Sequence, residues 1–445
     1  MLRRPWIVPR TALLALLLAL GCHTSRPALA GPVAQAEPDT LAALRAVPGV
    51  AALEEVPDPP AGYRAFQGTF RQPVDHNQPA GPHFLQAFRV LHRDRKAPVV
   101  LALTGYDLAP LGVEEPTQLL EANQVEVEYR FFGDSMPQPT DWTRLDLRQA
   151  SHDFHALVQA LKPLYRGAWL STGASKGGGA VVDYRQFFPG DVAGTVAYVT
   201  PIDFSTADPR YPPFVASRGS AEVAASLTAW QRAVLAQWPA VRTFMAAEVQ
   251  AKGLTHACFS TDQYLQTALL EAPFTLWQHH TEALAKEAPA PEASAEAHYG
   301  FLARIFEPAG GPAQAFCDEQ FEAFYPYFHQ AATQLGYTAQ NEDLPGLPCP
   351  GFSLLASLTA ATAKAHDPAP MRALQAWVDQ RAERMLFLYG ENDPFTAAAF
   401  RVPSARDNHL FLVPGGNHFA KLADLPEAQR ARAHARIRAW AAPQL

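Results

Sequence analysis

Residues 170–179 read LSTGASKGGG, and the rest of the chain is interpreted around them. They follow a short apolar run at 167–170 and lead into a helix-like segment at 180–188. The pattern G-x-S-x-G at 173–177 is typical of a serine on a strained strand-to-helix turn. Such a crowded turn admits only glycine two residues to either side, and the N–H after the serine faces the carbonyl oxygen under attack. The stretch predicts Ser175 as a nucleophile; a glycine-rich turn with a solvated serine is the alternative.

Strand-like runs precede this stretch and follow it. Alternating apolar and polar residues predict antiparallel strands at 63–70 and 83–92. A continuous apolar run at 97–103 is typical of a strand buried on both faces of a parallel sheet. Further strands are expected at 124–130 and 193–201, and a helix at 145–161.

The pattern changes between residues 204 and 383. Long amphipathic helices are expected there at 221–252, 261–287 and 321–336, with no strand-like run between them. Strands resume at 384–390 and 409–414, and a helix at 425–441 closes the chain. This order predicts the α/β class, with an α/β-hydrolase fold that carries a large, mainly helical cap insertion. The expected parts are a core at 63–203 and 384–445, and a cap at 204–383.

The N-terminal residues have the features of an export signal. Three arginines precede an uninterrupted apolar run at 12–20, which is too short to span a bilayer. We therefore expect a signal peptide at 1–21, followed by an Ala/Pro/Glu-rich linker at 22–62. The segment LALGC at 18–22 resembles a bacterial lipoprotein cleavage site, with Cys22 as the lipidated residue that would anchor the protein to a membrane. Cleavage after Ala30 is the alternative and gives a soluble secreted protein; both predict an exported protein.

Composition and charge narrow the class of protein. The chain has 445 residues, 48% of them hydrophobic, which is enough for a large core and argues against global disorder. A net charge of −7 argues against nucleic acid as the main partner. Two of the cysteines Cys258, Cys317 and Cys349 are expected to pair in an oxidising compartment. Cysteines and histidines nowhere show metal-ligand spacing, so neither a structural zinc nor another cofactor is expected.

Two loops that follow late strands supply partners for the serine. In this fold the chain order is serine, acid, histidine. Asp393 follows the strand at 384–390 and His418 follows the strand at 409–414, so His418 is expected to take the serine proton while Asp393 orients the imidazole. Glu391 is a rival acid and His409 a rival base. His409 begins its strand, which predicts a position on the wrong side of the sheet.

The oxyanion hole is expected to use two backbone N–H groups. One is that of Lys176, directly after the nucleophile, and the other comes from the loop at 104–106, with Tyr106 as the expected donor. Tyr106 as a packing aromatic is the alternative.

Four motifs together resemble peptidase family S37, the secreted prolyl tri/tetrapeptidyl aminopeptidases, and the related prolyl carboxypeptidase and dipeptidyl-peptidase II group. They are TGASKGG at 172–178, EYRFFGDSMP at 128–137, YGENDP at 389–394 and GGNH at 415–418. The resemblance implies a serine exopeptidase that removes short peptides from free N-termini, with proline preferred before the cut. Gly179 stands where that family is expected to have a bulkier apolar residue.

An exopeptidase of this kind needs an acidic group for the ammonium of its substrate. Glu128 is expected near the carboxyl edge of the sheet and is the first candidate, although pairing with Arg130 would give it a structural role. Acids of the cap are further candidates, namely Glu222, Glu248 and Asp262.

Two other functions are compatible with the same residues. A carboxylester hydrolase would use the same elbow, triad and oxyanion loop, with the cap shaping an acyl pocket. A non-catalytic binding lipoprotein would keep only the fold. Loss of hydrolysis in Ser175→Ala would separate catalysis from binding.

Overall fold

The computed structural model describes residues 40–339, 344–359 and 364–442. The expected signal peptide at 1–21, the lipidation candidate Cys22 and the linker up to residue 39 lie outside these residues. No helix in the described ranges is both long and apolar enough to cross a membrane.

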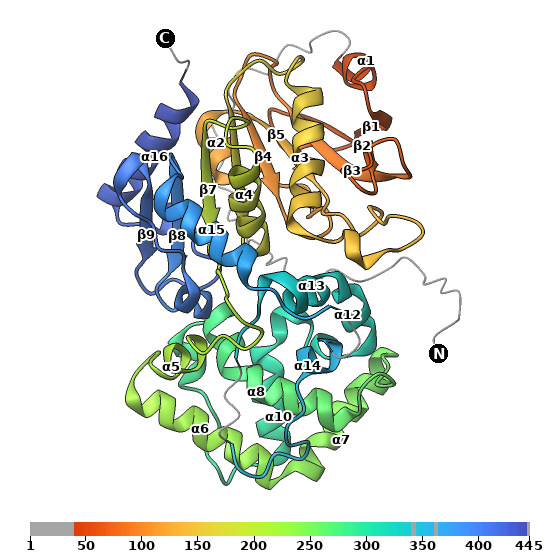
Figure 1. Ribbon diagram of the computed structural model, residues 1–445. Helices are drawn as coiled ribbons and strands as arrows, with labels where there is room; N and C mark the ends of the chain where they lie inside the picture. The colour runs from red at the N-terminus through yellow and green to blue at the C-terminus, as the bar shows by residue number, and fades with distance from the viewer. Residues whose placement is uncertain (1–39, 340–343, 360–363, 443–445) are drawn as a thin grey trace.

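The core is one nine-stranded sheet (Figure 1). Its strands are β1 Val50–Val56, β2 Arg64–Pro73, β3 His83–His92, β4 Val99–Leu103, β5 Asn123–Val127, β6 Trp169–Ala174, β7 Gly194–Tyr198, β8 Met385–Gly390 and β9 His409–Val413. The spatial order is β1-β2-β3-β5-β4-β6-β7-β8-β9. Strands β1, β2 and β3 are antiparallel to their neighbours. The remaining six strands, β4 to β9, all run parallel to one another. This is the sheet of an α/β-hydrolase fold with an added N-terminal strand.

Residues 40–56 correct the expected linker. They form helix α1 Thr40–Arg45 and strand β1, which pairs with β2 from Val50 opposite Phe70 to Val56 opposite Ala65. The composition of the whole stretch suggested a linker. However, its prolines flank the strand at Pro48 and Pro57 and leave every ladder N–H of β1 in place.

Helices cover both faces of the sheet. On one face lie α3 Leu147–Leu161, α4 Lys176–Phe187 and α15 Ala369–Gln380, which share a core with the strands (Figure 1). On the other face, α2 Glu115–Leu120 and α16 Glu427–Ala441 pack against a second apolar cluster. Because Met371, Leu374 and Val378 of α15 are buried in the sheet core, the cap ends before α15 and not at residue 383 as expected.

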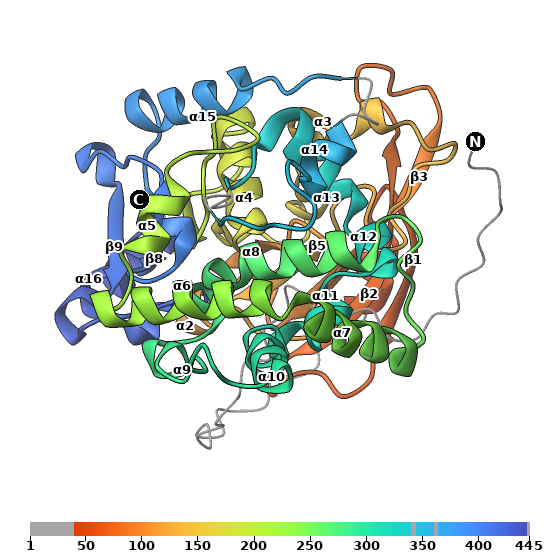
Figure 2. The same cartoon turned by 90° about the horizontal axis from the view of Figure 1, so that it is seen from below.

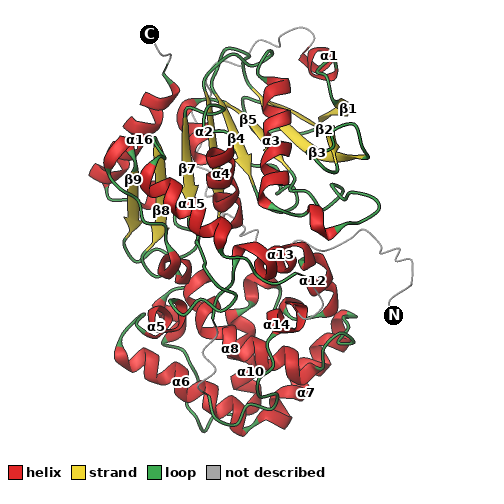
Figure 3. Cartoon of the chain, in the orientation of Figure 1, coloured by secondary structure: helices red, strands yellow, loops and turns green. Residues whose placement is uncertain are grey.

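The cap is a separate layer of helices below the carboxyl edge of the sheet (Figures 2 and 3). Its helices are α5 Tyr211–Ala216, α6 Ala221–Ala236, α7 Trp238–Lys252, α8 Thr261–His279, α9 Glu282–Ala285, α10 Ala295–Ile305, α11 Pro312–Ala315, α12 Asp318–Ala323, α13 Tyr325–Gln330 and α14 Leu354–Thr359. Most of these helices share an apolar core of their own, distinct from the sheet core.

Shorter helical turns complete the described chain. The 3₁₀ turns are η1 Trp142–Arg144, η2 Glu307–Ala309, η4 Pro394–Ala398, η5 Ala405–Asp407 and η6 Leu422–Asp424, and η3 Ala331–Leu335 is a π-helical turn.

The expected disulfide is absent from the described residues. Cys258, Cys317 and Cys349 are all free thiols. Cys317 is buried at the start of α12, where its Sγ donates to the carbonyl of Gln314 (3.4 Å), whereas Cys258 is exposed on a cap loop. The prediction from cysteine count is therefore wrong, because the cap helices pack around an apolar core that needs no such link.

Candidate active site

Ser175 lies on the sharp turn between β6 and α4. Its backbone has φ 55° and ψ −125°, a conformation that residues with a side chain rarely adopt. Its N–H donates to the carbonyl of Tyr198 at the end of β7 (2.9 Å). The turn therefore holds the serine at the carboxyl edge of the sheet, in the geometry of a nucleophile elbow.

The glycines around Ser175 have no room for a side chain. A Cβ on Gly173 would collide with the carbonyl oxygen of Gly177, and a Cβ on Gly177 would collide with that of Leu103. A Cβ on Gly178 would lie 2.7 Å from the Thr200 side chain. The glycines of the G-x-S-x-G pattern are therefore required because the backbones of the strand, the turn and the helix approach one another closely.

Asp393 and His418 form a buried pair. Asp393 follows β8 and is fully buried; its Oδ1 accepts the N–H of Phe395 (3.1 Å) and its Oδ2 lies 2.9 Å from Nδ1 of His418. Nε2 of His418 is buried and has no hydrogen-bond partner among the described residues. The aspartate therefore orients the ring and leaves Nε2 available to accept a proton.

The pair and the serine belong to one site. β6, β8 and β9 are parallel, so the loops that carry Ser175, Asp393 and His418 leave the same edge of the sheet. The His418 N–H donates to the carbonyl of Gln278 (3.0 Å), and its ring centroid lies 4.9 Å from that of Phe395. Gln278, Phe395 and Ser175 all line the same cavity.

The rival acid and base are occupied elsewhere. Glu391 accepts the N–H of Gly415 (2.8 Å), and His409 at the start of β9 lies 2.7 Å from Asp407. The position of His409 at the far end of its strand agrees with the expectation from the sequence.

The oxyanion loop packs directly against the elbow. Gly105 has φ +79°, and a Cβ on it would lie 2.8 Å from the backbone nitrogen of Gly177. The N–H of Lys176 is at the first position of α4, where a helix has no internal partner for it. The N–H of Tyr106 instead donates to Oγ1 of Thr104 (3.1 Å). Since that bond commits it to its own loop, the geometry does not support Tyr106 as a ready second donor.

The side chain of Lys176 has a role that the sequence did not reveal. Its Nζ lies 3.4 Å from the ring centroid of Tyr129, 5.2 Å from that of Tyr106 and 5.1 Å from that of Phe132, and it donates to the carbonyl of Gly105. Burial holds the pKa of this ammonium well below its usual value. Lys176 therefore ties the oxyanion loop to the nucleophile turn, inside an aromatic cage.

Glu128 is a structural residue and not a substrate ligand. Its carboxylate accepts the N–H (3.0 Å) and the hydroxyl (2.7 Å) of Ser135, as well as the N–H of Leu108 (3.3 Å). Burial raises the pKa of Glu128, and these hydrogen bonds oppose that shift. The expected partner Arg130 pairs instead with Asp153, at 2.6 and 2.8 Å. Glu128 does not line the cavity, so the geometry supports the structural alternative rather than binding of the substrate.

The three cap acids proposed from the sequence also lie away from the cavity. Glu222 is exposed, Glu248 pairs with Lys252 (2.6 Å), and Asp262 accepts the indole N–H of Trp238 (2.7 Å). Helical periodicity alone could not show which face of each cap helix meets the core.

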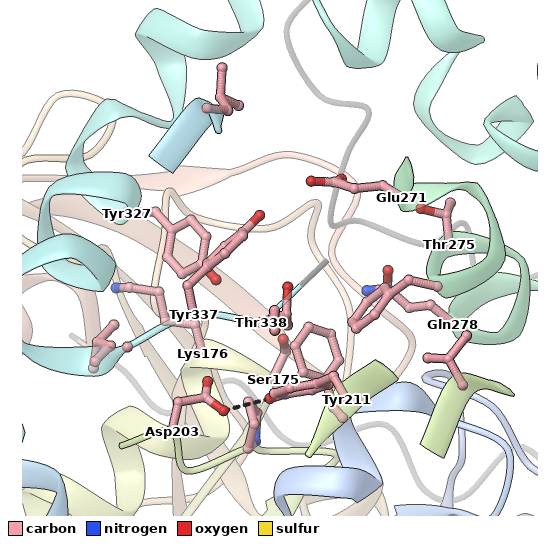
Figure 4. Close-up of a pocket in the computed structure, with 18 of the residues that line it drawn as sticks. Ser175, Lys176, Asp203, Tyr211, Glu271, Thr275, Gln278, Tyr327, Tyr337 and Thr338 are labelled. Atoms are coloured by element: carbon pink, nitrogen blue, oxygen red, sulfur yellow. Dashed lines mark hydrogen bonds between the residues drawn. The ribbon is translucent and has the colours of Figure 1, made fainter. Parts of the chain in front are cut away.

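A cavity of about 310 Å³ separates the cap from the core (Figure 4). Ser175 and Lys176 lie on its core side, and helix α8 contributes one cap wall. Its acidic residues are Asp183, Asp203 and Glu271, none of which the sequence singled out. Many aromatic side chains line it, among them Tyr106, Tyr129, Tyr211, Phe274, Phe324, Tyr327, Phe328, Tyr337, Phe395 and Phe400.

Two of the buried acids have raised pKa values. Burial raises the pKa of Asp203 to about 7, although the hydroxyl of Tyr211 donates to it at 2.7 Å. Burial also raises the pKa of Asp183 to about 8, an effect that Lys176 opposes. Burial therefore favours the neutral form of both carboxyl groups.

Comparison with solved structures gives matches at low identity. A proline iminopeptidase of Mycobacterium smegmatis is 15% identical, with a TM-score of 0.37, over 84% of this chain and 98% of that one. A peroxisomal α/β-hydrolase of Saccharomyces cerevisiae is 11% identical, with a TM-score of 0.36, over 86% of this chain and 91% of that one.

Comparison of sequences gives a much stronger match. A prolyl tri/tetrapeptidyl aminopeptidase of Streptomyces mobaraensis is 37% identical over 409 residues, which cover 89% of this chain and 84% of that protein. The model of the family described as PS-10 peptidase S37 matches residues 35–444. The chain belongs to peptidase family S37 and is a serine peptidase.

Proposed function

We propose that this protein is a serine exopeptidase that releases tripeptides or similar short peptides from free N-termini, with proline before the cut. The observation that carries the proposal is the buried Asp393–His418 pair, whose neighbours Gln278 and Phe395 line the same cap-covered cavity as Ser175. The similarity to a prolyl tri/tetrapeptidyl aminopeptidase supports the product length and the proline preference. Family membership does not favour the carboxylester hydrolase or the non-catalytic binding protein.

The reaction follows from the positions of the three side chains. Oγ of Ser175 attacks the carbonyl carbon of the residue before the cut, and its proton passes to Nε2 of His418. Asp393 stabilises the imidazolium that forms. The C–N bond then breaks, and the same proton goes to the leaving amine. Water hydrolyses the ester on Ser175 by the reverse sequence and releases the short peptide with a free carboxylate.

The oxyanion of each tetrahedral intermediate is assigned to the N-terminal end of α4. The N–H of Lys176 is the first donor, and the partial positive charge of the helix terminus adds to it. The N–H of Tyr106 becomes the second donor only when it leaves Oγ1 of Thr104.

An aromatic cluster beside the triad supports the preference for proline. The rings of Phe274 and Phe395 have centroids 5.1 Å apart, and that of Tyr211 lies 5.9 Å from Phe274 and 6.1 Å from Phe395. All three residues line the cavity, and Phe395 also contacts His418. A flat, apolar pyrrolidine ring fits such walls, since it buries its surface there without leaving an N–H unpaired.

The N-terminal sequence supports export as a lipoprotein. In this proposal the signal peptide at 1–21 is removed and Cys22 carries the lipid that anchors the protein. Radiolabelled palmitate in a bacterial expression host should label the wild-type protein but not Cys22→Ala. Labelling of neither, with a mature N-terminus after Ala30, would show a soluble secreted protein instead.

Product analysis tests the proposed activity. The purified protein is incubated with a free peptide that has proline at its third position, and the products are identified by mass spectrometry. We expect release of the N-terminal tripeptide and no release by Ser175→Ala. Cleavage only inside long peptides, or hydrolysis only of p-nitrophenyl butyrate, would contradict the proposal.

A further inference from the structure

We propose that Glu271 of helix α8 binds the α-ammonium group of the substrate and that α8 thereby sets the length of the released peptide. This inference rests on the proposed exopeptidase function and deepens it. It identifies the residue that binds the ammonium group, which none of the sequence motifs singles out. It also gives a physical reason why the released peptide has three residues.

One face of α8 lines the cavity from end to end. Glu271, Phe274, Thr275 and Gln278 all contribute to the cavity wall, at the spacing that places helical residues on a single face. Figure 4 shows the side chains of Glu271, Thr275 and Gln278 on one side of the cavity, with Asp203 on the opposite side of the view. The helix therefore presents one carboxylate at a fixed distance along the wall.

The near end of this face is fixed to the catalytic histidine. The carbonyl of Gln278 accepts the N–H of His418 at 3.0 Å. Seven residues separate Gln278 from Glu271, which corresponds to about 10.5 Å along an α-helix. An extended tripeptide spans about 10 Å at 3.3–3.6 Å per residue. An extended chain with its third carbonyl at the triad therefore has its first nitrogen beside Glu271.

The helix is held firmly enough to act as a fixed spacer. Pro273 lies inside α8 and lacks the N–H that would bond to the carbonyl of Leu269. The side-chain amide of Gln231 donates to that carbonyl instead (2.9 Å). Leu269 and Leu276 on the opposite face are buried in the cap core. The backbone hydrogen bond is lost at Pro273, but the carbonyl of Leu269 keeps a donor in Gln231.

The surroundings of Glu271 suit an ammonium group. Burial raises the pKa of Tyr337, and the Glu271 carboxylate raises it further, so the two side chains lie within electrostatic reach. Tyr327 is affected by Glu271 in the same way, and both rings line the cavity. A carboxylate next to tyrosine rings combines ion pairing with cation–π attraction.

The other two acids of the cavity are less suitable. Asp203 already accepts the hydroxyl of Tyr211, and Asp183 lies on α4 beside the buried Lys176. Asp203 is on the loop directly after β7. Thr200 of the same loop packs against Gly178 of α4. An ammonium bound there would lie beside the nucleophile and leave no space for three residues.

The test uses a set of p-nitroanilides: Pro, Ala-Pro, Ala-Ala-Pro, Ala-Ala-Ala-Pro, and Ala-Ala-Pro with a succinylated N-terminus. We expect Glu271→Gln to lower kcat/KM for free Ala-Ala-Pro-p-nitroanilide by about 10- to 100-fold, because a charged hydrogen bond is lost. The preference for three residues and for the free terminus should fall with it. Glu222→Gln, a change in an exposed cap acid, is the matched control and should keep both preferences.

Further measurements separate the role of Glu271 from folding and from the function itself. Hydrolysis of p-nitrophenyl acetate, which has no ammonium, reports whether the triad is assembled, and its decrease in Glu271→Gln should be much smaller than that for the tripeptide substrate. Glu271→Asp keeps the charge and should restore part of the preference for the free terminus. Unchanged preferences in Glu271→Gln, or their loss in Asp203→Asn instead, would overturn the inference. If the wild type cleaves no member of the set, the proposed function itself fails.

Discussion

Ser175 has a positive φ, and Gly173 and Gly177, two residues to either side of it, have no room for a side chain. This is why the nucleophile could be predicted from the sequence: strained backbone and close packing restrict the residue types at each position of the turn. Asp393 and His418 were predictable for a similar reason, since each directly follows a strand. Glu271 was not predictable, because its role depends on which face of a cap helix meets the core.

The Asp393–His418 pair gives a prediction at the scale of one side chain. Asp393→Asn keeps the shape of the group but favours the wrong tautomer of His418, so kcat should fall by about 10⁴-fold. Steady-state kinetics with a tripeptidyl p-nitroanilide measure the effect. Glu391→Gln in the same loop is the matched control and should remain active, because the Glu391 carboxylate accepts the N–H of Gly415 in the next loop and does not contact His418 among the described residues. Equal losses in the two variants would contradict the assignment of the acid.

The buried carboxyl of Asp203 predicts a pH dependence of stability. Burial raises its pKa to about 7 in the folded protein, whereas an unfolded aspartate ionises near 3.9. Between these values the folded state binds more protons than the unfolded state, so this group makes stability fall as pH rises. Asp203→Asn removes the ionisation. Its free energy of unfolding relative to the wild type should therefore increase from about pH 4 to pH 7. A difference that stays constant in urea titrations across this range would refute the argument.

At the scale of elements, the strands were easier to predict than the helices. The strand at 83–92 was predicted with its observed bounds. The expected helix at 221–252 is two helices, since Pro239 lies in the first turn of α7 and the chain turns at Gln237. The expected helix at 261–287 ends at His279, and a new helix begins at Glu282. Amphipathic periodicity continues across such breaks and does not reveal them.

Two neighbouring glycines in the first turn of α4 should respond in opposite ways. A Cβ on Gly178 would lie 2.7 Å from the Thr200 side chain, so Gly178→Ala should lower stability by about 1–3 kcal/mol. A Cβ on Gly179 would lie at an ordinary 3.5 Å from Oγ1 of Thr200, so Gly179→Ala should raise stability by roughly 0.5–1 kcal/mol through helix propensity. Urea unfolding of both variants checks the pair. Destabilisation by both would show that the elbow helix is equally crowded at the two positions.

Gly179 also has a place in the site. The family resemblance predicts a bulkier apolar residue at this position. In the structure Gly179 lines the cavity, one turn along α4 from Ser175. The missing side chain therefore leaves space beside the nucleophile.

At the scale of the whole molecule, the α/β-hydrolase core and the helical cap were predictable from the order of strand-like and helical segments. The boundaries of these two parts were less predictable. Residues 40–56 belong to the core rather than to a linker, and α15 belongs to the core rather than to the cap. Both errors have the same origin, since packing against a sheet is a long-range contact that local composition does not record. The three free cysteines are a further case, because cysteine count carries no distances.

We expect the cavity between cap and core to restrict the general hydrolase mechanism to exopeptidase substrates. Ser175 is reached from a space of about 310 Å³ whose walls come from both parts of the chain. In our proposal a substrate enters this cavity with a free end, and Glu271 binds that end. The cap, rather than the triad, is expected to determine which peptides are cleaved.

The most direct test compares release of p-nitroaniline by the wild-type protein from Ala-Ala-Pro-p-nitroanilide with a free N-terminus and with a succinylated one. Rapid cleavage of the free substrate alone is the predicted result, because succinylation removes the ammonium and lengthens the chain beyond the cavity. Equal cleavage of both would show an open, endopeptidase-like site. Cleavage of neither, with hydrolysis of p-nitrophenyl butyrate, would contradict the assignment as an aminopeptidase.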